Sequence, residues 1–159
     1  MESYSHPFPP IINASTRILF LGSFPSIASF EQVYFKINLS SVKIIFHVRL
    51  ETNEAKKTFC LEKGIGLWDV ISSCERSNSS DTNLKNCLPN NFETLLNDYP
   101  NIKVFAFTGK KSYDLFLKYY KNLSVEKVLL PSTSPAHAAM KREEKTAIYK
   151  AFLNQFLTV

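Results

Sequence analysis

RILFLGSFPS (residues 17–26) is the most informative segment for the fold, because a short apolar run stops at a glycine and continues as a turn-rich loop. An apolar run of this length, bounded by Gly and Pro, is typical of a strand that is buried on both faces of a sheet. We therefore predict a buried strand over residues 17–21 that feeds a tight loop over residues 22–26.

The rest of the chain alternates between strand-like and helix-like segments. Further strands are predicted over residues 102–107 and 127–130, and the apolar run 65–71 precedes a polar segment, 72–83, that we interpret as a loop. Helices are predicted over residues 52–63, 91–99, 110–121 and 142–157, whereas residues 31–50 contain β-like runs of uncertain type. Strand–helix alternation of this kind predicts an α/β fold, in which a parallel sheet is covered by helices on both faces.

Length and composition favour one packed domain over residues 1–159. Of the 159 residues 45% are hydrophobic, Phe and Tyr together number 20, and Gly only 4. Such a chain can bury a core of its own and lacks the composition of a disordered segment. No apolar run reaches the roughly 18 residues of a membrane helix, and the first ten residues lack the regions of a signal peptide. We expect a soluble, cytoplasmic monomer.

The net charge of +5 lies entirely in the last third of the chain. Residues 1–107 carry ten Lys or Arg and ten Asp or Glu, whereas residues 108–159 carry nine against four. A basic patch suits a polyanion such as nucleic acid. The simpler interpretation from charge alone is a solvated helix face, because several of these side chains lie on one predicted helix: Lys110, Lys111, Lys118 and Lys121.

Several common sites are excluded by spacing. The cysteines Cys60, Cys74 and Cys87 form no CxxC pair, which argues against a disulfide framework, a zinc site and an iron–sulfur cluster. Gly109-Lys110-Lys111-Ser112 resembles the end of a P-loop, but Val104 stands where the first glycine of that motif is required. Neither the dinucleotide pattern GxGxxG nor the hydrolase pattern GxSxG occurs. The histidine of HPFPP, at position 6, is interpreted as a loop residue.

Two polar segments remain as candidate sites. Trp68, Asp69, Arg76 and Asp81 follow one another near the apolar run 65–71, where core, cap and turn roles are favoured and contact with a ligand is the alternative. The other segment is the loop PSTSPA after the last strand, in which prolines restrict the backbone and hydroxyls suit phosphate. Because this loop and the loop over residues 22–26 both leave the carboxyl ends of strands, we expect them at one edge of the sheet.

Taken together, the segments resemble the uracil-DNA glycosylase superfamily, and most closely its hypoxanthine-DNA (deoxyinosine) glycosylase group. GSFPS after the first strand combined with LPSTSPA after the last is a specific pair, and the matching segments span nearly the whole chain in the expected order. They are HPFPPII (6–12), RILFLGSFPSIASF (17–30), GIGLWDVISSCERSNSSD (64–81), VFAFTGKKSYDLF (104–116) and LPSTSPA (130–136). The resemblance implies a three-layer α/β/α sandwich with a central, mostly parallel four-stranded sheet.

The resemblance also implies an activity, namely hydrolysis of the N-glycosidic bond of a deaminated base in DNA, most closely hypoxanthine, without metal or cofactor. Such an enzyme must flip the nucleotide out of the duplex. By resemblance, the first loop lines the base pocket, with a phenylalanine placed to stack on the base: Gly22, Ser23, Phe24, Pro25 and Ser26. The second loop contacts the duplex and its phosphates: Pro131, Ser132, Thr133, Ser134 and Pro135.

The segment over residues 34–43 departs from the family pattern. Sister families carry a water-positioning Asp or Asn at the third position of the first motif, where this chain has Phe24. The hypoxanthine group instead carries a segment that resembles YYxNPxNxFW, in which the second Asn positions the water. The corresponding segment of this chain reads YFKINLSSVK. Counted from Tyr34, the aligned position is Ser40, and Asn38 is the amide nearby. Three explanations follow: a glycosylase that uses Asn38 or Ser40, a protein of the same fold that binds damaged DNA without cleaving it, and a local disturbance of the reading frame in this segment.

Overall fold

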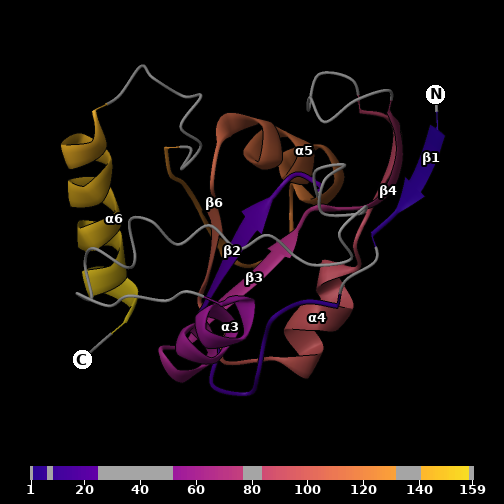
Figure 1. The fold of residues 1–159 in the computed structure, drawn as a ribbon. Coiled ribbons are helices and arrows are strands. Elements are labelled where there is room, and N and C mark those ends of the chain that lie inside the picture. Colours follow the sequence, from indigo (N-terminus) through magenta and orange to yellow (C-terminus); the bar gives the residue numbers. More distant parts are fainter. Residues whose placement is uncertain (1, 7–8, 25–51, 77–83, 132–140, 158–159) are drawn as a thin grey trace.

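Four parallel strands form the central sheet, in the order β3-β2-β6-β7 (Figure 1). The computed structural model describes residues 2–6, 9–24, 52–76, 84–131 and 141–157. Within these, the strands of the central sheet are β2 (Ile18–Gly22), β3 (Ile65–Asp69), β6 (Val104–Phe107) and β7 (Glu126–Leu129). The predicted strand over residues 17–21 is confirmed. It lies inside the sheet between β3 and β6, which explains its unbroken apolar run.

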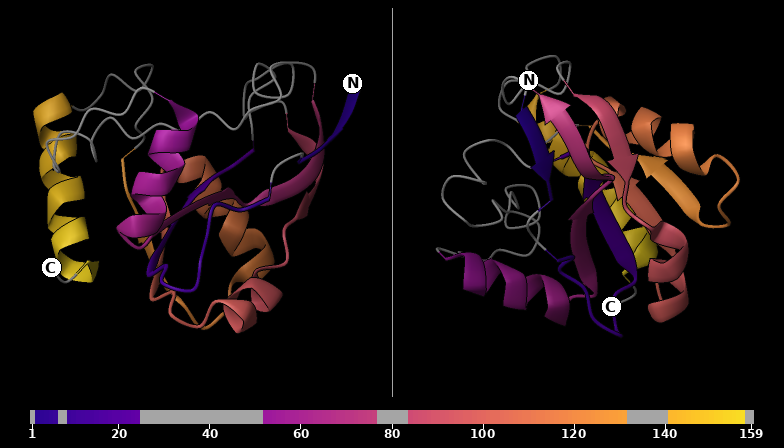
Figure 2. Two further views of the ribbon diagram at one scale, coloured as in Figure 1. Left: turned by 60° about the horizontal axis from the view of Figure 1, so that its bottom comes forward. Right: turned by 90° about the vertical axis from the view of Figure 1, so that its right-hand side faces the viewer.

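Helices cover both faces of this sheet. They are α3 (Asn53–Glu62), α4 (Phe92–Asp98), α5 (Lys110–Tyr120) and α6 (Arg142–Phe156). One core cluster joins α3 and α6 to one face of the sheet, and a second joins α4 and α5 to the other (Figure 2). The three-layer α/β/α sandwich is therefore confirmed. None of the helices in the described part of the chain is long and apolar enough to cross a membrane.

A second sheet of three antiparallel strands lies beside β3, in the order β1-β4-β5. Its strands are β1 (Glu2–Ser5), β4 (Ile71–Arg76) and β5 (Lys85–Pro89). The interpretation of residues 72–83 as a loop was thus wrong for residues 72–76. The sequence does not indicate this strand, because its residues are mostly polar. The buried positions, Cys74 and Arg76, therefore do not stand out as an apolar alternation. The apolar run 65–71 is also divided, since β3 ends at Asp69 and β4 begins at Ile71.

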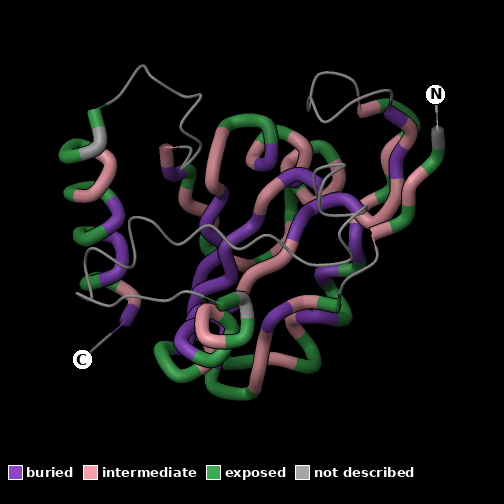
Figure 3. The backbone as a smooth tube through the Cα atoms, viewed as in Figure 1, coloured by how far each residue is buried: buried purple, intermediate pink, exposed green. Residues whose placement is uncertain are grey.

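Phe92, the first residue of α4, is the centre of the aromatic core between the sheet and the helices α4 and α5. It is fully buried, and its ring lies 5.4–5.7 Å from the rings of Trp68, Phe105, Phe116 and Tyr120. The contacts are edge-on, the geometry that aromatic pairs prefer. Figure 3 shows the buried residues along the central strands and the exposed ones on the outer surfaces of the helices.

We expect Phe92→Ala to lower the free energy of unfolding by about 3–5 kcal/mol, because it leaves a cavity at the junction of four rings. Phe92→Leu should cost less, since it refills part of the space. Urea denaturation measures both, with Leu88→Ala as the control because Leu88 is 62% exposed. An equal loss of stability in Phe92→Ala and Leu88→Ala would contradict the assignment of Phe92 to the core.

Candidate functional site

The connections that follow β2 and β6 leave the carboxyl edge of the sheet toward opposite faces. From β2 the chain leads to α3 on one face of the sheet, and from β6 it leads to α5 on the opposite face. Open α/β sheets bind ligands at such a switch point, because neighbouring connections diverge there and leave a crevice. Thr108, which follows β6, bridges the seam by donating its backbone N–H to the Leu21 carbonyl at 3.2 Å.

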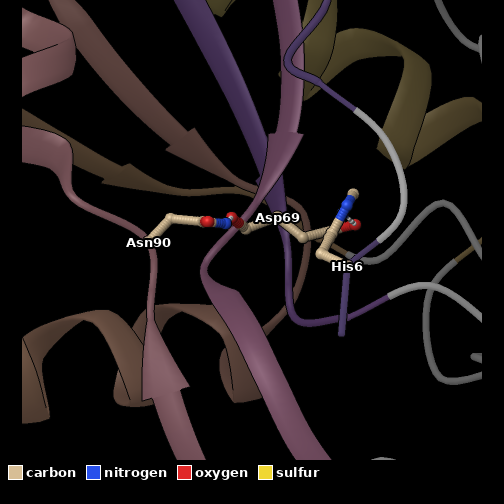
Figure 4. A network of polar contacts seen from close by, with 3 residues as sticks. All are labelled: His6, Asp69 and Asn90. Atoms are coloured by element: carbon tan, nitrogen blue, oxygen red, sulfur yellow. Dashed lines mark hydrogen bonds and ion pairs between the residues drawn. The ribbon is translucent and has the colours of Figure 1, made fainter. Parts of the chain in front are cut away.

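Asp69 is the polar centre of this edge and ends β3. Its Oδ2 lies 2.9 Å from Nε2 of His6, and the two side chains are only 10% and 3% exposed (Figure 4). The Asp69 backbone carbonyl accepts a hydrogen bond of 2.9 Å from Nδ2 of Asn90. Asn90 is held in turn by Tyr120, whose hydroxyl donates to its carbonyl at 2.6 Å. The polar groups of Asp69 thus satisfy the rule that buried polar atoms need partners.

Gly22 permits Asp69 to take this position. The two residues are opposite each other in the register of β2 and β3. A Cβ atom on Gly22 would lie 2.6 Å from Oδ1 of Asp69, closer than real side chains approach. The glycine that ends the apolar run is therefore required by a close approach across the sheet and not by an unusual backbone conformation.

Beyond Gly22, the loop continues to be paired with the chain that follows β3. The carbonyl of Gly22 accepts from the N–H of Val70 at 2.8 Å, and the carbonyl of Ser23 accepts from that of Ile71 at 3.1 Å. Ser23 and Phe24 are both buried. The first three residues of the loop are therefore fixed by backbone hydrogen bonds and packing before the chain leaves the described residues at position 25.

The ring of Phe24 packs between a cation and an imidazole. The Arg76 guanidinium carbon lies 5.0 Å from its centroid, and the His6 ring meets it edge-on at 6.0 Å. Arg76, which is 1% exposed, also lies 5.5 Å from the ring of Tyr4. Cation–π contacts of this kind hold an aromatic ring in a defined orientation. The small sheet, which supplies both Tyr4 and Arg76, therefore supports the loop after β2.

The second predicted loop starts at the same edge, two strands away. Pro131 follows the end of β7, and its carbonyl accepts a hydrogen bond of 2.8 Å from the hydroxyl of Tyr149 on α6. Burial raises the pKa of this hydroxyl, so that it stays protonated, and a donor, even in alkaline solution. The remaining residues predicted for the site lie outside the described residues: Pro25, Ser26, Asn38, Ser40, Ser132, Thr133, Ser134 and Pro135.

Asp69 is a candidate in the sequence analysis but is not paired there with His6. His6 was interpreted only as a loop residue, and the structural interpretation was favoured for Asp69. The position of Asp69 at the end of an apolar run was a usable signal, because the carboxyl ends of neighbouring parallel strands meet at one edge. No sequence signal connects His6 with Asp69, since the two are 63 residues apart and meet only through the pairing of β1 with β4.

This edge brings together aromatic and polar groups of different kinds. Among the described residues, no three His, Cys, Asp or Glu side chains gather closely enough to hold a metal. What the edge combines is an aromatic ring, a rigid backbone turn and a buried carboxylate–imidazole pair. The fold is therefore an α/β/α sandwich, and His6, Asp69 and Phe24 lie together at the carboxyl ends of β2 and β3.

Comparison with known proteins identifies the family. The model of the uracil DNA glycosylase superfamily matches residues 9–158. A hypoxanthine DNA glycosylase of Methanosarcina barkeri is 32% identical, over 91% of this chain and 96% of its own length. One of Methanosarcina acetivorans is 27% identical, over 87% and 92%. The solution NMR structure of a candidate uracil DNA glycosylase from the latter organism matches with a TM-score of 0.75, at 26% identity over 91% of this chain and 95% of its own.

The chain therefore belongs to the uracil DNA glycosylase superfamily. The resemblance inferred from its motifs is confirmed, and the curated relatives named above carry the name of the hypoxanthine group.

The contact between Gly22 and Asp69 can be tested by a double-mutant cycle. We expect Gly22→Ala to lower the free energy of unfolding by about 1–3 kcal/mol, because the new methyl group overlaps Oδ1 of Asp69. The same change should cost less in an Asp69→Ala background, where that oxygen is missing. Urea denaturation of the four proteins measures the coupling. Equal costs in both backgrounds would show that the clash lies elsewhere.

Proposed function

We propose that this protein is a DNA glycosylase that hydrolyses the N-glycosidic bond of hypoxanthine in deoxyinosine-containing DNA. The observation that carries the proposal is the loop Gly22–Phe24, which the superfamily pattern assigns to the base pocket and which here is fixed against Asp69 and His6 at the switch point of the sheet. The names of the two curated relatives support hypoxanthine as the base.

In this proposal the flipped base enters the crevice at the carboxyl edge. A base inside a duplex is out of reach, so the nucleotide must leave the stack before the bond can be cleaved. The backbone of Gly22 and Ser23 borders this crevice, and the buried ring of Phe24, packed against Arg76 and His6, holds that backbone from behind. Preorganised groups of this kind need no rearrangement when charge develops on the sugar and the leaving base.

The attacking water needs a polar group to hold it, and two residues are proposed for that task. Asn38 offers an amide and Ser40 a hydroxyl, the latter at the position aligned with the catalytic Asn of the hypoxanthine group. The departure of residues 34–43 from the family pattern favours a second candidate function, which is binding of damaged DNA without cleavage. Activity of the wild-type protein decides between the two.

The cleavage test uses a duplex with one deoxyinosine, scored as alkali-labile abasic sites. We expect the wild-type protein to cleave, and Asn38→Ala to lower the rate by about 10²–10³-fold if Asn38 holds the water. Ser40→Ala is the matched change at the aligned position and reports in the same way on its hydroxyl. A matched duplex with deoxyadenosine is the control substrate.

The possible outcomes separate the two functions. A silent wild-type protein that becomes active as Ser40→Asn would be a binding protein with an intact pocket and a missing catalytic group. A protein that neither cleaves nor preferentially binds the deoxyinosine duplex would contradict both functions.

Phosphate contact from the basic last third of the chain predicts a salt dependence. Lys111 is exposed in the first turn of α5, directly after the carboxyl edge, whereas Lys103 is exposed at the opposite edge, before β6. We expect Lys111→Gln to reduce the slope of log affinity against log salt by about one, because one phosphate contact is lost. Lys103→Gln is the control and should leave the slope unchanged. Equal slopes in both variants would remove Lys111 from the interface with DNA.

A further inference from the structure

His6 and Asp69 connect the N-terminal segment to the loop after β2. Beyond β1, the N–H of His6 donates to the carbonyl of Ser72 at 2.6 Å, which anchors the residue to β4. From this anchor, the imidazole reaches Oδ2 of Asp69 at 2.9 Å. A strand of the small sheet is thus joined by one side chain to the last residue of a strand in the central sheet (Figure 4).

Both ends of this connection bear on the proposed base pocket. The other carboxylate oxygen of Asp69, Oδ1, lies against Gly22, the first residue of the loop. The imidazole itself meets the rings of Phe24 and Trp68 edge-on, with centroids 6.0 and 6.3 Å away. A change in the His6–Asp69 distance would therefore shift the loop at Gly22 and at Phe24 together.

Burial makes this hydrogen bond sensitive to substitution. The side chains of His6 and Asp69 are 3% and 10% exposed, so water cannot readily replace a missing partner. A buried carboxylate that loses its donor pays the cost of desolvation without compensation, and it would be expected to turn toward other donors or toward solvent. Because Oδ1 fills the space where a Cβ of Gly22 would lie, such a turn would change the packing at the start of the loop.

We propose that His6 and Asp69 are positioning residues of the base pocket, whose buried hydrogen bond holds Gly22 and Phe24 in the geometry that receives the flipped base. The proposal rests on the function proposed above. It assigns to the N-terminal segment a role in placing the base at the carboxyl edge of the central sheet, although neither side chain need touch the reacting atoms.

Two substitutions separate the hydrogen bond from the packing of the ring. His6→Gln keeps an N–H donor at a similar reach but removes the ring. His6→Phe keeps an aromatic ring but removes the donor. Ser5→Ala, at the exposed neighbouring position of β1, is the control.

The activity readout is single-turnover cleavage of the deoxyinosine duplex, compared with binding to a duplex that contains an abasic-site analogue. We expect His6→Phe to lower the single-turnover rate on the order of tenfold to a hundredfold, because a small misplacement in the pocket has effects of that size. His6→Gln should stay near the wild-type rate. Binding to the abasic duplex, which has no base to place, should be unchanged in both variants.

A second readout is independent of activity. Trp68 is the single tryptophan of the chain, so the emission of the free protein reports on the surroundings of His6. Acrylamide quenching of Trp68 should increase in His6→Phe, and remain close to that of the Ser5→Ala control in His6→Gln.

The results decide between positioning and mere stabilisation of the fold. The proposal is overturned if His6→Phe cleaves at the wild-type rate. It is also overturned if both His6 variants lose the cleavage rate equally and also lose binding to abasic DNA and thermal stability. If the wild-type protein itself neither cleaves nor prefers deoxyinosine, the proposed function fails. In that case only the quenching of Trp68 tests the role of the hydrogen bond. Unchanged quenching in His6→Phe would show that the hydrogen bond does not hold the loop.

Discussion

The close approach of Asp69 to Gly22 is the constraint on which the site depends. A carboxylate can be buried at the end of β3 only if the facing residue of β2 has no side chain and a donor satisfies the charged oxygen. Gly22 meets the first condition, and His6 meets the second at 2.9 Å. Three segments that are distant in the sequence are thereby brought to one point.

The small antiparallel sheet serves the same point from outside the sandwich. Its pairing of β1 with β4 places His6 beside Asp69, and its strands bring Tyr4 and Arg76 to the ring of Phe24. On the other side, Asn90 and Tyr120 fix the backbone of Asp69 through two hydrogen bonds. The loop after β2 is therefore supported by both sheets and by helix α5, which suits a site that must keep its shape when a ligand enters.

The two loops at the carboxyl edge are supported by different parts of the fold. The loop after β2 depends on the small sheet, whereas the segment after β7 is tied at Pro131 to the buried hydroxyl of Tyr149 on α6. In the function proposed above, this division would allow the base pocket and the contact with the DNA backbone to vary independently, since the two loops share an edge but no described side chain.

The central sheet and its covering helices could be predicted from local patterns in the sequence. Buried parallel strands appear in a sequence as continuous apolar runs, and helices appear as apolar residues repeated about every three or four positions. Both patterns are local. The motifs GSFPS and LPSTSPA also revealed the superfamily. That residues 72–76 form a strand, that Asp69 requires a glycine at position 22, and that His6 is the partner of that carboxylate could be seen only in the tertiary structure. These features depend on strand pairing between distant segments, and no local pattern records which polar residues such pairing will bury together.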